Sequence, residues 1–358
     1  MREGIEGGGA AATNVELDTN VTDIIHSHAV PRRTSADRLH DLLSMPAGAI
    51  LLVFVVVQLG CIIAGLLFPD DFRYLSPQNM GIMMRSVPVL GCLALGAGVL
   101  MIAGEFDLSI GSVYTLTAVV MAMLVGNGID AFIAAPVGLA IGAAIGLLNG
   151  ALTLRFNLPS FIVTLGGLLF WRGAVLLING AVQVRFDPNP VFDALFGGTV
   201  FGINAAFLWF VALCGFFHLL IHRHRFGNHV FATGGNRSAA TAIGVNTARI
   251  KLVAFAIAGT MAAFAGILAT TRVGSVQPGQ GAGLELQAIA ACVIGGLSLR
   301  GGRGSILGVF LGVMLIFTIT DVLLLMRAPG FYLDMFIATL IVVASIFNHG
   351  LDRRGVSS

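Results

Sequence analysis

Long apolar runs separated by short polar connections fill the chain after about residue 46. A run of about 20 mainly apolar residues is long enough to cross the hydrocarbon core of a bilayer as a helix. Ten runs predict such helices: 47–67, 87–103, 109–125, 131–154, 159–178, 205–221, 252–271, 282–299, 306–325 and 331–347. Several have only about 17 residues, near the lower limit for a straight span. The pattern predicts an all-α polytopic membrane protein with about ten transmembrane helices, some short or broken.

The flanking segments differ in character from this region. Residues 1–45 are mixed polar and lack an apolar stretch close to the N-terminus, which argues against a signal peptide. We interpret them as a disordered tail, and residues 349–358 as a second tail. The transmembrane region then covers 46–348, with a polar loop at 222–251 between the sixth and seventh runs.

Composition supports the membrane assignment and excludes other classes. The chain is 56% hydrophobic and only 11% charged, whereas about 25% of the residues of a soluble domain are charged. The net charge of +2 and the absence of interleaved basic and aromatic residues give no support to nucleic-acid binding. The cysteines lie inside apolar runs without metal-ligand spacing, so we expect free thiols and no metal or other cofactor.

Lysine and arginine predict the orientation of the chain. In a ten-span arrangement, 14 of the 20 basic residues fall on one side of the membrane: before the first span, after the fourth, sixth, eighth and tenth. Basic residues are enriched on the cytoplasmic side. We therefore expect both termini and the 222–251 loop in the cytoplasm, and the chain in the plasma membrane.

The polar stretch GGNRSAATAIGVNTARIK, residues 234–251, predicts a short helix within that loop. Asn236 is a good N-cap, and Gly244 is a plausible C-terminal stop. Ala239, Ala240 and Ile243 then share one face at three- and four-residue spacing. Such a face could dock into a soluble partner, or it could lie against its own chain.

Two acids sit between the second and third runs. Glu105 and Asp107 precede Ser109 in GEFDLSIGS. Carboxylates at membrane depth are costly and usually mark a pathway or a partner. Two interpretations stay open for Glu105, Asp107 and Ser109: a well-capped turn, or a lining of the translocation pathway.

The fifth run carries further polar candidates for that pathway. Arg172 could extend its charge toward the membrane surface, pair with a carboxylate, or line a passage. Ser160, Thr164 and Asn179 could hydrogen-bond the hydroxyls of a solute or neighbouring helices. Glycines at four-residue spacing, such as Gly142 and Gly146 or Gly308 and Gly312, predict close helix packing.

Three motifs carry a resemblance. GEFDLSIGS at 104–112, LPSFIVTLGGLLFWRG at 158–173 and the segment from GNRSAATAIG to LRGGRGSILG are similar to those of permease subunits of bacterial ABC importers for ribose, xylose, galactose and related sugars. The resemblance covers about residue 47 to the end of the chain. Glu105 departs from the commoner GGIDLSVGS pattern, which has glycine there.

The resemblance implies a function and partners. It implies translocation of a monosaccharide by alternating access in a permease dimer, formed with a second copy or a paralogue. ATP hydrolysis is then expected in a separate ATPase subunit, and a periplasmic sugar-binding protein delivers the solute. The polar loop would be the coupling helix that contacts the ATPase, with Gly235, Asn236, Ala239, Ala240, Ile243 and Gly244 matching the family positions.

Other classes remain as alternatives. A secondary transporter of a small polar solute would place ionisable residues near mid-span, and such residues are scarce here. A membrane enzyme would need a clustered catalytic set, and the sequence shows none. The chain also has no GxxxxGK[ST] phosphate loop, so we do not expect it to hydrolyse ATP itself.

Overall fold

The computed structural model describes residues 48–332, 335–336, 338–339 and 342–343. Both predicted tails, and most of the tenth predicted span, lie outside the described residues. Within the described part of the chain, seven helices are long and apolar enough to cross a membrane. The structure confirms a polytopic all-α architecture.

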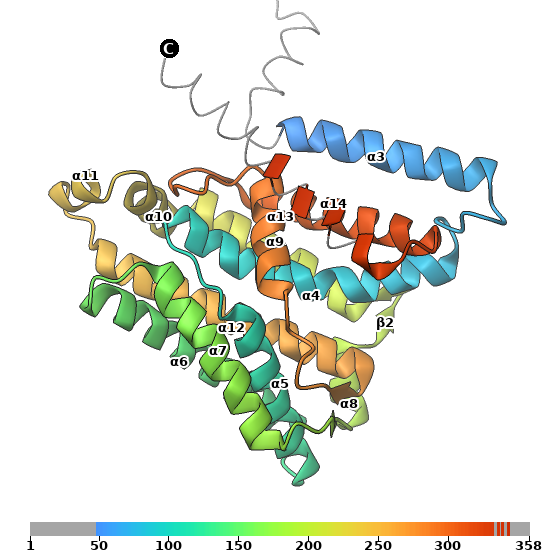
Figure 1. The fold of residues 1–358 in the computed structure, drawn as a ribbon, viewed down its shortest axis with the longest axis horizontal. Coiled ribbons are helices and arrows are strands. Elements are labelled where there is room, and N and C mark those ends of the chain that lie inside the picture. Colours follow the sequence, from blue (N-terminus) through green and yellow to red (C-terminus); the bar gives the residue numbers. More distant parts are fainter. Residues whose placement is uncertain (1–47, 333–334, 337, 340–341, 344–358) are drawn as a thin grey trace, which may run out of the picture. The chain divides into compact units, whose positions relative to one another are not determined.

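Figure 1 shows the principal helices, coloured in chain order from blue to red. The seven long apolar helices are α3 (Gly48–Leu67), α4 (Pro77–Ile102), α6 (Ala131–Arg155), α7 (Ser160–Asn179), α9 (Ala205–His222), α12 (Thr247–Val273) and α14 (Ile306–Leu325). The shorter helices are α5 (Ile110–Gly126), α8 (Pro190–Phe196), α10 (Arg225–Gly235), α11 (Arg237–Ala242) and α13 (Leu284–Ile294).

Helix α4 begins ten residues before the predicted start at Val87. The Ser76 side chain accepts a hydrogen bond from the Asn79 backbone N–H, and Pro77 occupies the first turn, where its missing N–H costs nothing. The helix then passes through the buried Pro88. The polar residues of this first part concealed the helix from a hydropathy pattern.

Helix α12 lies at the centre of the packing and contacts α4, α5 and α6. Glycines permit its close approach to α6: a Cβ on Gly142 would lie 2.4 Å from the Gly259 carbonyl oxygen, and one on Gly146 would lie 2.1 Å from that of Phe255. Helix α14 approaches α13 in the same way through Gly308 and Gly312. The predicted role of these glycine spacings in close packing is confirmed.

The eighth predicted span, Ala282–Leu299, is wrong in length, because the structure has only the short helix α13 there. This helix has 11 residues, and at 1.5 Å per residue it is about 17 Å long, roughly half of a bilayer core. Pro278, Gly279, Gly281 and Gly283 keep the preceding segment non-helical, and Gly295 and Gly296 end the helix. Non-helical backbone at membrane depth requires burial in protein or contact with a water-filled cavity.

Two short strand pairs join connecting segments. Strand β1 (Val184–Arg185) pairs antiparallel with β4 (Ser275–Val276), so the α7–α8 connection holds the segment that precedes α13. Strands β2 (Thr199–Val200) and β3 (Ile203–Asn204) form a small hairpin before α9.

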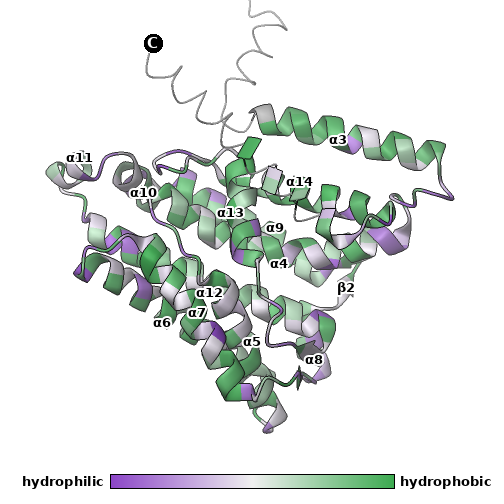
Figure 2. Cartoon of the chain, viewed as in Figure 1, coloured by the Kyte–Doolittle hydropathy of each residue, from purple (hydrophilic) through white to green (hydrophobic). Residues whose placement is uncertain are grey.

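Helices α3 and α7 have broad apolar surfaces that the described part of the chain does not cover. In the most apolar stretch of each helix, only 17% of the residues are buried. Figure 2 shows both helices coloured mainly as hydrophobic. Exposed apolar patches of this extent indicate contact with lipid or with another membrane chain.

Candidate functional site

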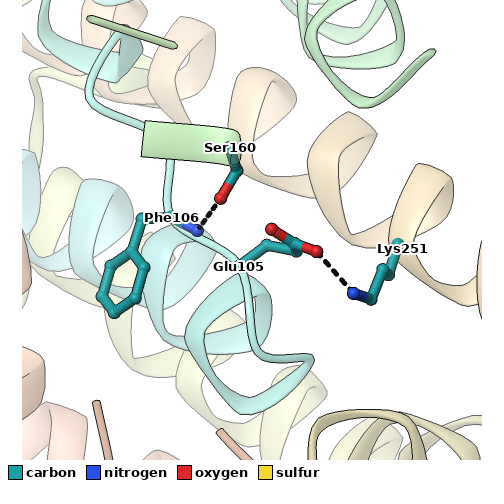
Figure 3. A network of polar contacts seen from close by, with 4 residues as sticks. All are labelled: Glu105, Phe106, Ser160 and Lys251. Carbon is teal, nitrogen blue, oxygen red and sulfur yellow. Dashed lines mark hydrogen bonds and ion pairs between the residues drawn. The ribbon is translucent and has the colours of Figure 1, made fainter. Parts of the chain in front are cut away.

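The loop between α4 and α5 connects several elements at one end of the bundle. The Glu105 carboxylate forms an ion pair with the Lys251 ammonium at the start of α12, and the Phe106 backbone N–H donates to Ser160 Oγ at 3.1 Å (Figure 3). The Glu105 and Lys251 side chains are only 12% and 9% exposed. The loop therefore joins the C-terminal end of α4 to the first turns of α7 and α12.

Asp107 forms a capped turn in the same loop. One carboxylate oxygen accepts from the Ser109 backbone N–H at 2.7 Å and from Ser109 Oγ at 2.6 Å. The other accepts from Asn149 Nδ2 at 3.3 Å, and Asn149 also donates to Ser109 Oγ. Burial raises the pKa of the Asp107 carboxyl, while these hydrogen bonds act in the opposite direction. This geometry accounts for Asp107 and Ser109 as the N-terminal anchor of α5.

Glycine residues bring the backbones of three segments into direct contact beside this loop. A Cβ on Gly234 of α10 would lie 1.9 Å from the Ile102 carbonyl oxygen and 2.7 Å from the Gly302 nitrogen. Gly104 and Gly302 adopt φ values of +82° and +72°, which side chains disfavour. The Gly302 N–H also donates to the Ile102 carbonyl at 2.9 Å. We call this contact the glycine junction; it holds α10 against the end of α4 and the α13–α14 connection.

The predicted loop at 222–251 contains more helix than expected. Helix α10 occupies Arg225–Gly235, with Gly227, Val230 and Thr233 buried at three-residue spacing. That spacing was the signal for a helix here. Helix α12 also starts at Thr247 rather than Leu252, because the Asn246 side chain caps its first turn.

Helix α11 matches the predicted short helix in position. The Asn236 side-chain oxygen accepts from the Ala239 N–H at 3.0 Å, and the glycine at 244 has a φ of +88°. The expected shared face is wrong for Ala240, whose side chain is 2% exposed within the buried core of this chain. Ile243 is 77% exposed, and Ala239 and Gly235 are exposed. The apolar residues that face solvent here are therefore Ala239, Ala242 and the C-cap residue Ile243, without Ala240.

The polar residues of α7 have partners within the described chain. Ser160 accepts from Phe106, Thr164 Oγ1 donates to the Ser160 carbonyl at 2.8 Å, and Asn179 bonds to the backbone of Ala181 and Val182. Ser160 and Thr164 are buried. These contacts give each residue a structural role, and their predicted part in translocation stays a prediction.

Arg172 borders a very small cavity between α7, α5 and the segment before α13. The cavity measures about 10 Å³ and is lined by Gly111, Ser112, Thr115, Arg172, Val175, Pro278, Gly279, Gly281 and Ala282. The predicted pairing of Arg172 with a carboxylate stays a prediction.

A larger polar cavity lies toward the other ends of α4 and α12. It measures about 220 Å³ and is lined by Arg85, Asp193, Phe196, Gly197, Asn204, Ala206, Leu268, Thr271 and Arg272. The Arg272 guanidinium donates to Ser86 Oγ at 2.6 Å. Two arginines at one cavity favour an anionic or hydrogen-bond-accepting group there.

Sequence reasoning missed Glu285, Asn149 and the pairing of Lys251. Glu285 lay inside a predicted span, and an ionisable residue inside a span is itself a signal of function. Asn149 was a lone amide in an apolar helix and had no comparable signal. The partner of Lys251 is 146 positions away in the chain, so no local pattern could identify it.

Metal chemistry receives no support from the described residues. They contain no group of three or more histidine, cysteine, aspartate or glutamate side chains that could hold a metal ion. The four cysteines are free thiols.

Comparison with known proteins adds independent information. The family described as "Branched-chain amino acid transport system / permease component" matches residues 79–345. The "Autoinducer 2 import system permease protein LsrC" of Escherichia coli O9:H4 (strain HS) is 36% identical over 283 residues, which is 79% of this chain and 82% of the relative. The Shigella flexneri protein of that name is 37% identical over 283 residues, with the same coverage of both chains.

A third relative extends the aligned region slightly. The protein of that name from Enterobacter sp. (strain 638) is 36% identical over 295 residues, 82% of this chain and 85% of the relative. No solved structure matches the chain.

Proposed function

Because this chain belongs to the family of the branched-chain amino acid transport system permease component, we propose that it imports a small polar solute as the membrane subunit of an ATP-driven complex. The family match runs from α4 through α14. It carries the proposal, because it spans nearly all the described membrane helices. A permease subunit provides the passage rather than the chemistry, so the chain is a transport protein and not an enzyme.

The α10–α11 segment is the proposed docking surface for the ATPase subunit. Ala239 and Ile243 face outward on α11, and an exposed isoleucine is an apolar anchor that a groove on a partner can bury. The glycine junction holds the preceding helix against α4. Movement of the docked partner would therefore reach the α4–α5 loop directly.

The opposite end of the bundle is the proposed entrance. It contains the polar cavity with Arg85 and Arg272. We propose that a periplasmic solute-binding protein docks there and releases its solute. A second permease copy or paralogue would cover part of the exposed apolar surface of α3 or α7, with lipid covering the remainder.

The proposed solute is a monosaccharide of the ribose, xylose or galactose type. The sequence motifs resemble those of sugar permeases, and the relatives are named for import of autoinducer 2. Autoinducer 2 is therefore the second candidate. The family description names branched-chain amino acids, which makes leucine the appropriate comparison.

Reconstitution tests this proposal. The chain is co-expressed and co-purified with candidate ATPase and solute-binding-protein subunits, and the complex is inserted into liposomes. Uptake of radiolabelled D-ribose, D-xylose, D-galactose, autoinducer 2 and L-leucine is measured with and without internal ATP. We expect uptake of a sugar that requires both ATP and the binding protein.

Two outcomes would contradict the proposal. Uptake driven by an ion gradient without the ATPase would identify a secondary transporter. A reconstituted complex that hydrolyses ATP but moves no member of the panel would refute the proposed solute class.

A further inference from the structure

Glu285 presents a buried acceptor that the described chain leaves open. Its side chain is 5% exposed, and its Oε2 atom has no hydrogen-bond partner among the described residues. The other oxygen, Oε1, accepts from the Gly283 N–H at 3.2 Å. A buried acceptor without a partner costs free energy, and most such groups in native structures have one.

The open oxygen lies against the first turn of α5. A Cβ on Gly111 would lie 2.2 Å from Glu285 Oε2 and 2.4 Å from the Gly281 carbonyl oxygen. A Cβ on Gly281 would lie 2.0 Å from the Gly111 carbonyl oxygen. Two glycines thus let α5 and the segment before α13 touch through their backbones, directly beside the carboxylate.

Hydrogen-bonding groups of both signs surround this contact. The neighbouring cavity is lined by Arg172, Ser112 and Thr115 as well as by the two glycines. At about 10 Å³ it is no larger than the space of one water molecule. The arginine supplies donors and the carboxylate supplies an acceptor. The Ser112 and Thr115 hydroxyls donate to the Leu168 and Gly111 carbonyls, so their oxygens remain as acceptors.

The elements that meet here differ in how firmly they are held. Helix α5 is anchored by Asp107 and Asn149 through Ser109. The segment before α13 has no regular helix. Strand β4 joins it to the α7–α8 connection by two residue pairs, and Gln280 Nε2 donates to the Tyr114 hydroxyl of α5 at 3.0 Å. Separation of the segment from α5 would widen the cavity and expose Glu285 Oε2 to it, without unwinding a helix.

We propose that Glu285 and Arg172 contact the hydroxyl groups of the solute at a constriction between α5 and residues 277–285, and that the Gly111–Gly281 contact closes this constriction in the present conformation. The proposal rests on the proposed function and identifies where that function recognises its solute. A polyhydroxylated solute donates hydroxyl hydrogens to the carboxylate and accepts from the guanidinium. The hydroxyl groups of such a solute can therefore satisfy both the Glu285 acceptor and the Arg172 donors.

The test uses the reconstituted complex with Glu285→Gln and Arg172→Gln. The measured quantity is solute transported per ATP hydrolysed, with the transported member of the panel as the probe. We expect each substitution to lower this ratio about tenfold or more, while binding-protein-stimulated ATP hydrolysis stays within about twofold of wild type. Glutamine keeps the size of the glutamate side chain and one acceptor oxygen but replaces the second oxygen with a donor, which is why this conservative substitution is informative.

Gln287→Ala is the matched control, because Gln287 lies on the same short helix but, unlike Glu285, is not among the nearest neighbours of a Cβ on Gly111. It should leave the ratio unchanged. A second measurement compares D-ribose with 2-deoxy-D-ribose, or D-galactose with 2-deoxy-D-galactose if the panel selects galactose. Discrimination beyond that of the isolated binding protein should fall in Glu285→Gln.

The outcomes separate this inference from the proposed function. If wild type moves no panel member, the proposed function fails. If wild type transports a sugar and both variants keep the wild-type ratio, the constriction assignment is overturned. Parallel loss of ATP hydrolysis and assembled complex would show that Glu285 and Arg172 are structural. ATP-driven uptake of leucine alone would also overturn the assignment, because leucine carries no hydroxyl group.

Discussion

Glu105 stands where the commoner sugar-permease pattern has glycine, and its carboxylate is buried with the Lys251 ammonium. Removing one member of a buried ion pair leaves an uncompensated charge, whereas replacing both with apolar groups of similar volume is often neutral. A glutamate at position 105 is therefore coupled to the lysine at position 251, because each charge needs the other in this buried site. A chain with glycine at 105 would need another way to satisfy the lysine.

The Glu105–Lys251 pair can be tested by a double-mutant cycle. We expect Glu105→Leu and Lys251→Met each to destabilise the protein by about 3 kcal/mol, because each leaves one buried charge. The double variant should recover most of this loss. The thermal-denaturation midpoint of the purified complex in detergent provides the measurement, and additive losses in the double variant would show that the two residues act independently.

At the scale of elements, the glycine junction and α11 fix the position of the proposed docking surface within the polar loop at 222–251. The junction uses backbone contacts, so there is no side chain that could adjust to a misplaced helix. Helix α11 has only six residues, and so short a helix depends on its contacts rather than on intrinsic propensity. Its buried Ala240 supplies one such contact.

Gly234→Ala tests the junction. The new methyl group would lie 1.9 Å from the Ile102 carbonyl oxygen, so α10 must move away from α4. We expect at least a tenfold loss of solute transported per ATP hydrolysed. Gly235→Ala is the control, since its nearest atom would be 3.9 Å away. Equal effects of the two substitutions would mean that helix propensity, rather than the close contact, is responsible.

Ile243→Glu tests the docking surface. This side chain is 77% exposed, so the substitution leaves the fold of the single chain intact. In a desolvated interface an unpaired carboxylate costs about 3 kcal/mol or more, which weakens binding about a hundredfold. Co-purification of the ATPase subunit should fall accordingly, with membrane insertion unchanged.

Ala240→Glu and Arg237→Ala are the comparison variants for Ile243→Glu. The first substitution buries a charge inside the chain and should lower the yield of folded protein. The second removes an exposed side chain and should be mild. Full recovery of the ATPase with Ile243→Glu would place the docking surface elsewhere.

At the scale of the whole molecule, one end of the described bundle gathers the segments that the charge bias assigns to the cytoplasm. The end of α4 and the starts of α7 and α12 meet through the α4–α5 loop and the Glu105–Lys251 pair. The glycine junction adds α10 and the α13–α14 connection. These connections are every second one along the chain, and they lie together in space. This is the arrangement expected when an even number of membrane crossings separates each from the next.

Cysteine labelling tests which side of the membrane this end faces. In a background without native cysteines, Asn228→Cys on α10 should resist an impermeant thiol reagent added outside intact cells. Asp187→Cys, whose side chain is 82% exposed in the α7–α8 connection, should react. The reverse pattern would invert the predicted orientation.

The sequence predicted the elements better than their ends or their partners. Hydropathy located Ile306–Leu325 correctly, because an uncharged run with clear limits leaves little choice. It misplaced the start of α4, where Asn79 and Arg85 hide a helix, and the ends of α13, where glycines interrupt an apolar run. The pairings of Glu105 with Lys251 and of Asp107 with Asn149 depend on tertiary packing. Periodicity carries no information about such contacts.

The half-length of α13 also bears on how the chain enters the membrane during synthesis. Its 11 residues are too few for the insertion machinery to release as a stable span. The helix packs against α4 and α14, and α14 is made after it. We therefore expect a nascent chain to retain α13 beside the machinery until α14 emerges, and the two helices then to enter the bilayer together against helices already in place. The constriction that contains Glu285 is accordingly among the last parts of the passage to form.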